Sequence, residues 1–225
     1  MNNVVISYPN AGRTWLKKLT DGLDWEVDYT HQGSQNGERI DVEKLIQYYD
    51  QHLERYSNLN LLLLHREIKD NMVSTYFQTI HRVGYKFNNI SDFIRHPLHG
   101  VEKLIRFNSY WKNYTHCKNL FVIRYEDLNV TTSDTLNTMA RYFGENVDQT
   151  KMNEVVEYYS FHNMHHREAN QIGNEYYQSR TNVNQPETFK SRKGKVGGYV
   201  DYMTPEDIEY CDTMAEKYNY IELMK

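Results

Sequence analysis

The sequence predicts one α/β domain in which helices cover a parallel sheet. Short apolar or β-branched runs at residues 4–6, 59–64 and 119–124 are typical of strands buried on both faces. Segments with apolar residues at helical spacing alternate with these runs along the chain. The chain has 225 residues, enough for one such domain with a real core, so we expect residues 1–225 to form a single unit.

The chain opens with a strand, a tight loop and a helix. Val4–Ile6 form the β-branched run, residues 9–12 break it with Pro, Asn, Ala and Gly, and Leu16, Leu19 and Leu23 recur at helical spacing. The first N–H groups of such a helix lack internal partners and favour an anion above the loop. An ordinary turn between strand and helix is the alternative, and the spacing of a Walker phosphate loop is absent.

An anion site in this chain must be local. The formal net charge is −4, so the chain lacks the overall basic field of a nucleic-acid-binding protein, and we expect no nucleic-acid partner. Within the opening loop, Gly12 lets the main chain approach a phosphate closely, Arg13 offers a guanidinium and Thr14 a hydroxyl. The sequence therefore favours a small anionic ligand at the opening loop.

Cysteine usage and hydropathy indicate the compartment. Cys117 and Cys211 lie far apart without the spacing of a metal site, which suits a reducing compartment. No apolar run approaches the length that spans a bilayer. We therefore expect a cytoplasmic protein without a membrane span.

A second strand, predicted over Trp25–His31, runs into a loop at residues 32–37. This places His31 at the carboxyl end of a strand, the edge of an open α/β sheet where ligands bind. A structural role for His31 is the alternative. A helix is predicted from Asp41 to Tyr56, and the strand at 59–64 then brings Arg66 to the same edge.

The next helix is predicted to open at Asp70. Arg66 at the strand end and Ser74 about a turn into the helix can hold one phosphate from two sides, although Arg66 can equally pair with Asp70. Residues 82–100 are polar and predict an irregular excursion that builds an acceptor pocket. Further segments are predicted as a helix at 101–113, a strand at 119–124 ending in a turn at 125–128, and helices at 133–143 and 149–159.

The C-terminal part carries a histidine cluster and a basic loop. His162, His165 and His166 suggest zinc, but no nearby cysteine or carboxylate group completes a tetrahedral set, so we expect no metal. Residues 168–185 are polar and are predicted to be mobile. The run at 189–199 is either a solvated basic loop or an anion-binding loop whose glycines wrap a phosphate. A last helix is predicted from the Thr204 cap to about residue 218.

Four of these segments, in order, resemble the sulfotransferases that use 3′-phosphoadenosine 5′-phosphosulfate (PAPS). The opening loop matches that family's P-loop-like phosphosulfate-binding loop at Tyr8, Pro9, Gly12, Thr14 and Trp15. Residues 61–74 resemble its 3′-phosphate segment, residues 125–128 its Tyr-Glu-Asp turn, and residues 192–197 its Arg-Lys-Gly-x-x-Gly segment. The resemblance covers most of the chain and implies a four- to five-stranded parallel sheet. It departs at Asn10 and Tyr29, where the family commonly has lysine.

The resemblance implies transfer of a sulfuryl group from PAPS to a hydroxyl or amine of a small-molecule acceptor, without a metal. Tyr29-Thr30-His31 matches the end of the family's Lys-Thr-His segment, so His31 is the expected general base. Arg13 is expected to reach the sulfuryl or bridging oxygens in place of the missing lysine. The implied cofactor-binding residues are Asn10, Ala11, Gly12, Arg13, Thr14, Trp15, Arg66, Ser74, Tyr125, Arg192, Lys193 and Gly194.

Two other function classes share parts of this pattern. A small P-loop-type kinase has the same strand, loop and helix, but it needs a Lys-Ser/Thr pair for phosphate and magnesium, and Arg13-Thr14 is a poor substitute. A non-catalytic protein that binds PAPS or the product adenosine 3′,5′-bisphosphate (PAP) would explain Asn10 and Tyr29. The identity of the acceptor and the oligomeric state have no signal in the sequence.

Overall fold

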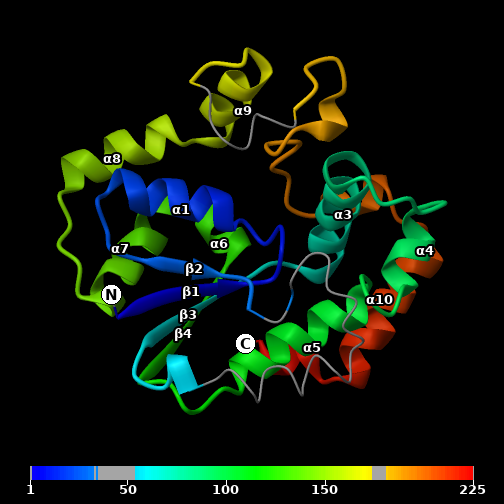
Figure 1. Ribbon diagram of the computed structural model, residues 1–225, viewed down its shortest axis with the longest axis horizontal. Coiled ribbons are helices and arrows are strands. Elements are labelled where there is room, and N and C mark those ends of the chain that lie inside the picture. Colours follow the sequence, from blue (N-terminus) through cyan, green and yellow to red (C-terminus); the bar gives the residue numbers. More distant parts are fainter. Residues whose placement is uncertain (1, 33, 35–53, 174–180, 225) are drawn as a thin grey trace.

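Four parallel strands form the centre of the molecule (Figure 1). The computed structural model describes residues 2–32, 34, 54–173 and 181–224. Within these residues the sheet has the strand order β2-β1-β3-β4, and all three pairings are parallel. The strands are β1 Asn3–Ser7, β2 Asp28–Thr30, β3 Asn60–His65 and β4 Asn119–Arg124. The predicted single α/β domain with a four- to five-stranded parallel sheet is confirmed.

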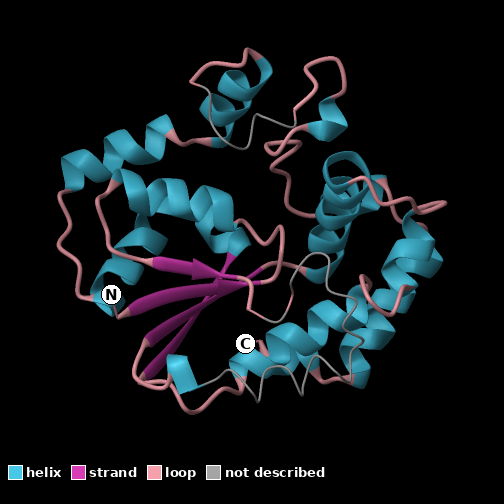
Figure 2. Cartoon of the chain, in the orientation of Figure 1, coloured by secondary structure: helices cyan, strands magenta, loops and turns pink. Residues whose placement is uncertain are grey.

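Helices cover both faces of this sheet (Figure 2). The α-helices are α1 Arg13–Gly22, α3 Ile68–Gln78, α4 Ile90–Arg95, α5 Val101–Lys112, α6 Tyr125–Val130, α7 Thr132–Phe143, α8 Gln149–Tyr158, α9 Phe161–Ala169, α10 Pro205–Lys217 and α11 Tyr220–Leu223. Shorter helical turns are η1 Glu54–Tyr56, η2 Thr79–Val83, η4 Pro186–Thr188 and η5 Gly198–Asp201. The predicted helices after β3, β4 and Thr204 are therefore present.

The alternation of side chains along the strands separates two cores. In β1, Val4 and Ile6 face a cluster with α3, α5 and α10, whereas Val5 faces a cluster with α1, α7 and α8. Leu61–Leu64 of β3 alternate between the same two clusters and are fully buried. Burial on both faces explains why the strands appear in the sequence as continuous apolar runs.

The order of the strands places a crevice between β1 and β3. The chain leaves β1 through α1 and pairs β2 on one side, whereas it leaves β3 through α3 to α5 and pairs β4 on the other side. The two connections diverge toward opposite faces of the sheet, as Figure 1 shows. In open α/β sheets such a point of divergence, at the carboxyl ends of the strands, is where ligands bind.

Several element boundaries differ from the sequence prediction. Only Asp28–Thr30 of the predicted strand at 25–31 pairs with β1. Helix α3 begins two residues before Asp70, because the Glu67 carboxylate accepts the Asp70 N–H at 2.8 Å and caps the helix there. The predicted turn at 125–128 is the first part of α6. Residues 82–100 are not wholly irregular, since Asn89 caps the short helix α4.

Two predicted segments extend outside the described residues. The helix predicted from 41 to 56 falls outside the described residues except for η1. Residues 174–180 of the segment predicted at 168–185 also fall outside them. The described part of that second segment includes Glu168, which is fully buried in α9. Across the described residues, none of the helices has both the length and the apolar character needed to cross a membrane.

Leu62→Ala tests the central position of β3. The side chain of Leu62 in β3 is fully buried against the helices α1 and α7. Its truncation is therefore expected to lower the free energy of unfolding by about 2–5 kcal/mol. Val130→Ala is the control because Val130 is 78% exposed, and it is expected to stay within about 0.5 kcal/mol of wild type. Urea denaturation measures both values. Equal stability of the two variants would contradict this packing.

Candidate active site

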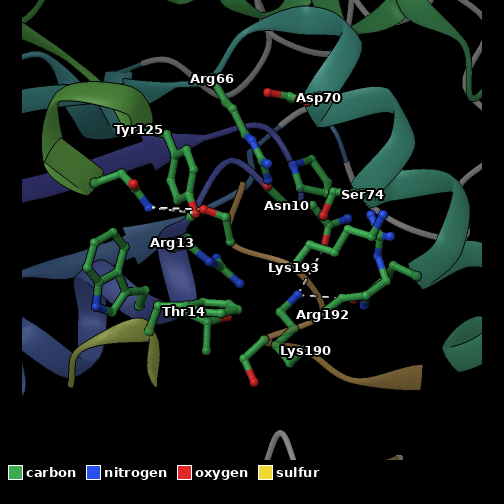
Figure 3. Close-up of a pocket in the computed structure, with 18 of the residues that line it drawn as sticks. Asn10, Arg13, Thr14, Arg66, Asp70, Ser74, Tyr125, Lys190, Arg192 and Lys193 are labelled. Carbon is green, nitrogen blue, oxygen red and sulfur yellow. Dashed lines mark hydrogen bonds between the residues drawn. The ribbon is translucent and has the colours of Figure 1, made fainter. Parts of the chain in front are cut away.

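A cavity of about 650 Å³ opens at the carboxyl edge of the sheet (Figure 3). Its walls are the loop after β1, the first turns of α3 and the segment at 190–198. Among the described residues, two aspartates and nine basic side chains line it; the basic ones are Arg13, Lys17, Lys18, Arg66, Arg82, Lys190, Arg192, Lys193 and Lys195. A strongly basic cavity in a chain of net negative charge is suited to an anionic ligand.

The loop after β1 presents the start of α1 to this cavity. Gly12 has φ 103° and Asn10 has φ 63°, and these left-handed conformations fold the loop tightly before Arg13 begins the helix. Arg13, Thr14 and Trp15 line the cavity. Ala11 differs from the other predicted loop residues, because its side chain is fully buried under the loop and its N–H donates to the Tyr8 carbonyl at 3.3 Å.

Gly12, Tyr125 and Arg66 lie close together beside the loop. A Cβ atom on Gly12 would lie 2.6 Å from the Tyr125 ring, so no larger residue fits without moving that ring. The Arg66 guanidinium lies 4.4 Å from the Tyr125 ring centroid, and its Nη1 donates to the Asn10 carbonyl at 3.4 Å. Trp15 meets Tyr125 edge-on at 6.0 Å. The aromatic ring thus connects the opening loop with the end of β3.

Asp70 holds the C-terminal loop instead of pairing with Arg66. Its carboxylate accepts the Gly197 N–H at 2.6 Å and the Tyr199 N–H at 2.9 Å. No ion pair joins Arg66 and Asp70, both of which the structure describes. The Arg66 guanidinium therefore keeps its charge for the cavity, which Ser74 also lines from α3.

The predicted basic residues of the C-terminal loop have different surroundings. The Arg192 guanidinium lies 4.2 Å from the Phe77 ring centroid and donates to the Tyr202 hydroxyl at 2.6 Å. Burial lowers the pKa of Arg192 from its ordinary value. Lys193 lies nearer the surface and pairs with Asp201 at 3.1 Å. Both side chains line the cavity.

Gly194 lies where the C-terminal loop meets α9. It has φ 60°, and an added Cβ would lie 2.4 Å from the Phe161 ring. Its carbonyl accepts a hydrogen bond from Asn129 of α6 at 3.4 Å. Any residue other than glycine at position 194 would therefore collide with the Phe161 ring.

His31 follows β2 and faces the cavity. Its Nδ1 lies 2.7 Å from the Ser7 carbonyl, which only accepts, so Nδ1 carries the proton and Nε2 keeps its lone pair. The pKa of His31 is lowered to about 3, first by burial and then by the charges of Arg13 and Lys190, while the hydrogen bond to the Ser7 carbonyl acts in the opposite direction. The imidazole is neutral at physiological pH and available as a proton acceptor.

Several residues that build the cavity are not predicted from the sequence. Lys190 lies in the basic run at 189–199 but was not among the predicted site residues, and its Nζ lies 2.9 Å from Asn10 Oδ1. Glu168 was assigned to a mobile segment, but its carboxylate accepts the backbone N–H groups of Lys190 and Ser191. Phe161 lines the cavity from the first turn of α9. Lys190 could have been found from its place in the basic run, whereas nothing in the sequence distinguishes Glu168 from a solvated acid.

The histidine cluster is part of α9 and not of a metal centre in the described residues. His165 Nδ1 donates to the Ser191 carbonyl at 2.7 Å, which fixes α9 against the C-terminal loop. No group of three or more metal-ligating side chains occurs in the part of the chain that the structure describes.

Comparison with known proteins favours the sulfotransferase class over the kinase class. A sequence model of the sulfotransferase domain family matches residues 2–225. The chain belongs to the sulfotransferase family. Cytosolic sulfotransferases 5 and 6 of Arabidopsis thaliana are each 22% identical to this sulfotransferase over 95% of its length, covering 78% and 77% of their own. The predicted enzyme class, a PAPS-dependent sulfotransferase, is confirmed.

Solved structures share the fold of this sulfotransferase. Mouse sulfotransferase SULT7A1, complexed with PAP, has a TM-score of 0.67 at 17% identity, with 96% of this chain and 84% of the mouse chain covered. Retinol dehydratase, in complex with androsterone and PAP, has a TM-score of 0.63 at 13% identity, with 96% and 80% covered. The kinase alternative has no support in these findings.

Gly12→Ala tests the contact between the opening loop and Tyr125. Gly144→Ala is a matched control, because Gly144 also has a positive φ, 74°, but no atom lies within 4 Å of an added Cβ. Backbone strain alone is expected to cost Gly144→Ala about 1–3 kcal/mol of unfolding free energy. Gly12→Ala is expected to cost more because the Tyr125 ring must also move. Chemical denaturation compares the two, and a Gly12→Ala protein as stable as Gly144→Ala would contradict the close contact.

Proposed function

We propose that this sulfotransferase moves the sulfuryl group of PAPS to a hydroxyl or amine of a small-molecule acceptor. The observation that carries this is the convergence of a helix N-terminus, the end of β3 and a basic C-terminal segment on one cavity. We further propose that residues 1–225 act as one sulfotransferase domain and that the protein is cytoplasmic. The relatives named cytosolic sulfotransferases support the compartment.

The residues that line the cavity fit the donor nucleotide. Its 3′-phosphate is assigned to Arg66, Ser74, Arg192 and Lys193, which approach from β3, α3 and the C-terminal loop. The phosphosulfate group is assigned to the loop from Asn10 to Thr14, where the first N–H groups of α1 are directed. Trp15 and Tyr125 supply aromatic surface for the adenine, and Gly194 allows close approach of the C-terminal loop. Ala11 contributes main chain only, since its side chain is buried.

PAPS, when bound, supplies an activated sulfuryl group. His31 Nε2 then accepts the proton of the acceptor hydroxyl or amine, because Nδ1 is occupied by the Ser7 carbonyl. Arg13 reaches the sulfuryl or bridging oxygens and stabilises the negative charge that grows there. The Arg13 guanidinium has no hydrogen-bond or ion-pair partner among the described residues, and burial lowers its pKa, which together favour an anionic partner. We expect these protein cations to suffice without a metal.

A screen of hydroxyl and amine acceptors with PAPS tests the function, with release of PAP as the measurement. We expect PAP release that depends on an acceptor. Tight binding of PAP without turnover on any acceptor class would support the non-catalytic alternative, and failure to bind PAP at all would contradict the proposed function.

Selectivity for the 3′-phosphate tests the assignment of Arg66. PAP is expected to bind much more tightly than AMP, and Arg66→Ala to weaken PAP binding by ~1.5–3 kcal/mol, the typical value of one charge-assisted contact. Arg141→Ala, which removes an exposed arginine of α7, is the control. Calorimetry measures all four affinities. Equal affinity for PAP and AMP, or wild-type affinity in Arg66→Ala, would remove this assignment.

His31→Ala tests the general base. Turnover is expected to fall roughly 10²–10⁴-fold while the affinity for PAP changes little, because His31 handles the acceptor's proton. His116→Ala, at an exposed position, is the control. Retained turnover in His31→Ala would assign the proton to another group or to the substrate itself.

The pH profile provides an independent test of His31. A base must be neutral to act, and the pKa of His31 is lowered to about 3 by burial and by the nearby cations. We therefore expect kcat/KM to show no loss from this group as the pH falls from 7 to 5. An ordinary histidine would protonate with a midpoint near pH ~6.5 and reduce kcat/KM below it. A decline with that midpoint, absent in His31→Ala, would contradict the lowered pKa.

A further inference from the structure

The opening loop and the end of β2 lack the two lysines that the family resemblance leads us to expect. Asn10 is neutral, and Tyr29 directs its hydroxyl to Thr20 Oγ1, 2.7 Å away beneath α1. Lys17, one turn into α1, pairs with Asp21 at 2.8 Å on an exposed surface. None of these three side chains brings a cation to the position of Asn10.

Lys190 brings a cation to that position from the other end of the chain. Its Nζ lies 2.9 Å from Asn10 Oδ1 and 3.0 Å from Gln78 Oε1. These acceptors use two of the three N–H bonds of the ammonium, and the side chain lines the cavity. No carboxylate lies within ion-pair distance of Lys190 in the described part of the chain, so its charge is not neutralised there.

The Asn10 side chain is oriented to receive Lys190. An ammonium can only donate, so Oδ1 of Asn10 must face Lys190, and Nδ2 then faces Thr75 Oγ1 at 3.3 Å. Thr75 in turn donates to Asn71 Oδ1 at 3.1 Å, which leaves its oxygen free to accept from Asn10. Asn10, which stands where a lysine is expected, is therefore held with its side-chain oxygen facing Lys190.

Helix α9 fixes the backbone that carries Lys190. The buried Glu168 carboxylate accepts the N–H of Lys190 at 2.7 Å and the N–H of Ser191 at 2.8 Å. The His165 ring donates to the Ser191 carbonyl at 2.7 Å. Figure 3 shows the Lys190 side chain entering the cavity on the same side as Arg192. Glu168 and His165 thus fix the backbone at Lys190, while Asn10 and Gln78 hold its ammonium.

Titratable groups from four parts of the fold face Lys190. Arg13 of α1 and Arg82 of η2 are cationic, Glu168 of α9 is anionic, and His31 after β2 is neutral. The pKa of Lys190 is lowered to about 8, first by burial and then by the charges of Arg82 and Arg13, while Glu168 acts in the opposite direction. An anion bound between these cations would raise that pKa again.

We propose that Lys190 is the cation that faces the bridging oxygen of the donor, in the place left by Asn10, with Glu168, Asn10 and Gln78 as its positioning residues. This rests on the proposed function. In the transfer, the sulfur bonds to the acceptor oxygen, the sulfur–oxygen bond to the nucleotide breaks, and the acceptor's proton passes to His31. The electron pair of the broken bond stays on the phosphate oxygen, beside Lys190. Arg13 approaches the same group from α1.

Binding of PAP tests the proposal without any acceptor. At pH 8 about half of the Lys190 side chains are neutral in the free protein, and the bound phosphate favours the charged form, so wild type is expected to take up roughly half a proton. Calorimetry in two buffers of different ionisation enthalpy measures this uptake. Lys190→Met is expected to abolish the uptake and to weaken PAP binding. Lys217→Met is the matched control, because Lys217 is exposed on α10 and pairs with Glu102.

Failure of this inference is distinguishable from failure of the proposed function. A protein that binds PAP selectively over AMP, but with the same proton uptake and affinity in Lys190→Met as in wild type, would overturn the role of Lys190 and leave the function intact. A wild-type protein that binds no PAP would remove the proposed function itself. Thermal unfolding of each variant shows whether it is folded.

A lysine exchange tests the equivalence of the two positions once an acceptor is known. Lys190→Met is expected to lower kcat roughly 10²–10³-fold, the usual effect of removing one group that stabilises developing charge. The double variant Asn10→Lys with Lys190→Met returns the cation to the opening loop and is expected to recover at least part of kcat. A Lys190→Met protein with wild-type kcat, or a double variant no faster than Lys190→Met, would overturn the proposal.

Discussion

The structure depends on holding many like charges around one cavity at the carboxyl edge of the sheet. Cations that approach each other repel, and burial away from water increases the cost. Burial explains why the pKa values of Arg13, Arg192 and Lys190 are all lowered, and repulsion from neighbouring cations adds to it at Arg192 and Lys190. The parallel sheet makes the arrangement possible because its strands end at one edge, so residues far apart in the sequence meet there.

The acidic groups around the cavity bind backbone N–H groups, and the aromatic rings contact guanidinium groups. Neither kind of contact neutralises the charge of the cations. Asp70 accepts two N–H groups of the C-terminal loop, and Glu168 accepts two from the segment that carries Lys190. Arg66 and Arg192 lie against aromatic rings, which attract a cation without forming an ion pair. The loops are therefore fixed while the guanidinium and ammonium charges remain available to an anion. We expect a bound nucleotide to fill the cavity and to stabilise the cations around it.

The sequence predicted the parts of this site that depend on local chemistry. The strand, loop and helix at the N-terminus follow from a β-branched run, a glycine and leucines at helical spacing, and Arg66 follows from its place after a buried strand. Long-range contacts were not predictable. Asn10 and Lys190 are 180 residues apart, and only the fold brings them within a hydrogen bond. Buried Glu168 appears in the sequence as one more polar residue, because burial and partners, not residue type, decide its role.

Local interactions also explain the smaller errors. Glu67 caps α3 earlier than the apolar spacing predicts, and β2 is short because only three residues reach β1. Asn10 at the position of the expected lysine makes Arg13, the nearest cation in sequence, a predicted replacement, and Arg13 does line the cavity. Sequence proximity does not indicate Lys190, whose ammonium reaches Asn10 only because the C-terminal segment folds back to this edge of the sheet.

A crystal structure of the protein with PAP tests the central claim most directly. We expect the 3′-phosphate among Arg66, Ser74 and Arg192. We also expect an oxygen of the 5′-phosphate within hydrogen-bond distance of both the N–H groups that begin α1 and Lys190 Nζ. A nucleotide bound elsewhere or in the reverse direction, or a 5′-phosphate that leaves Lys190 in contact with Asn10 and Gln78 alone, would contradict it.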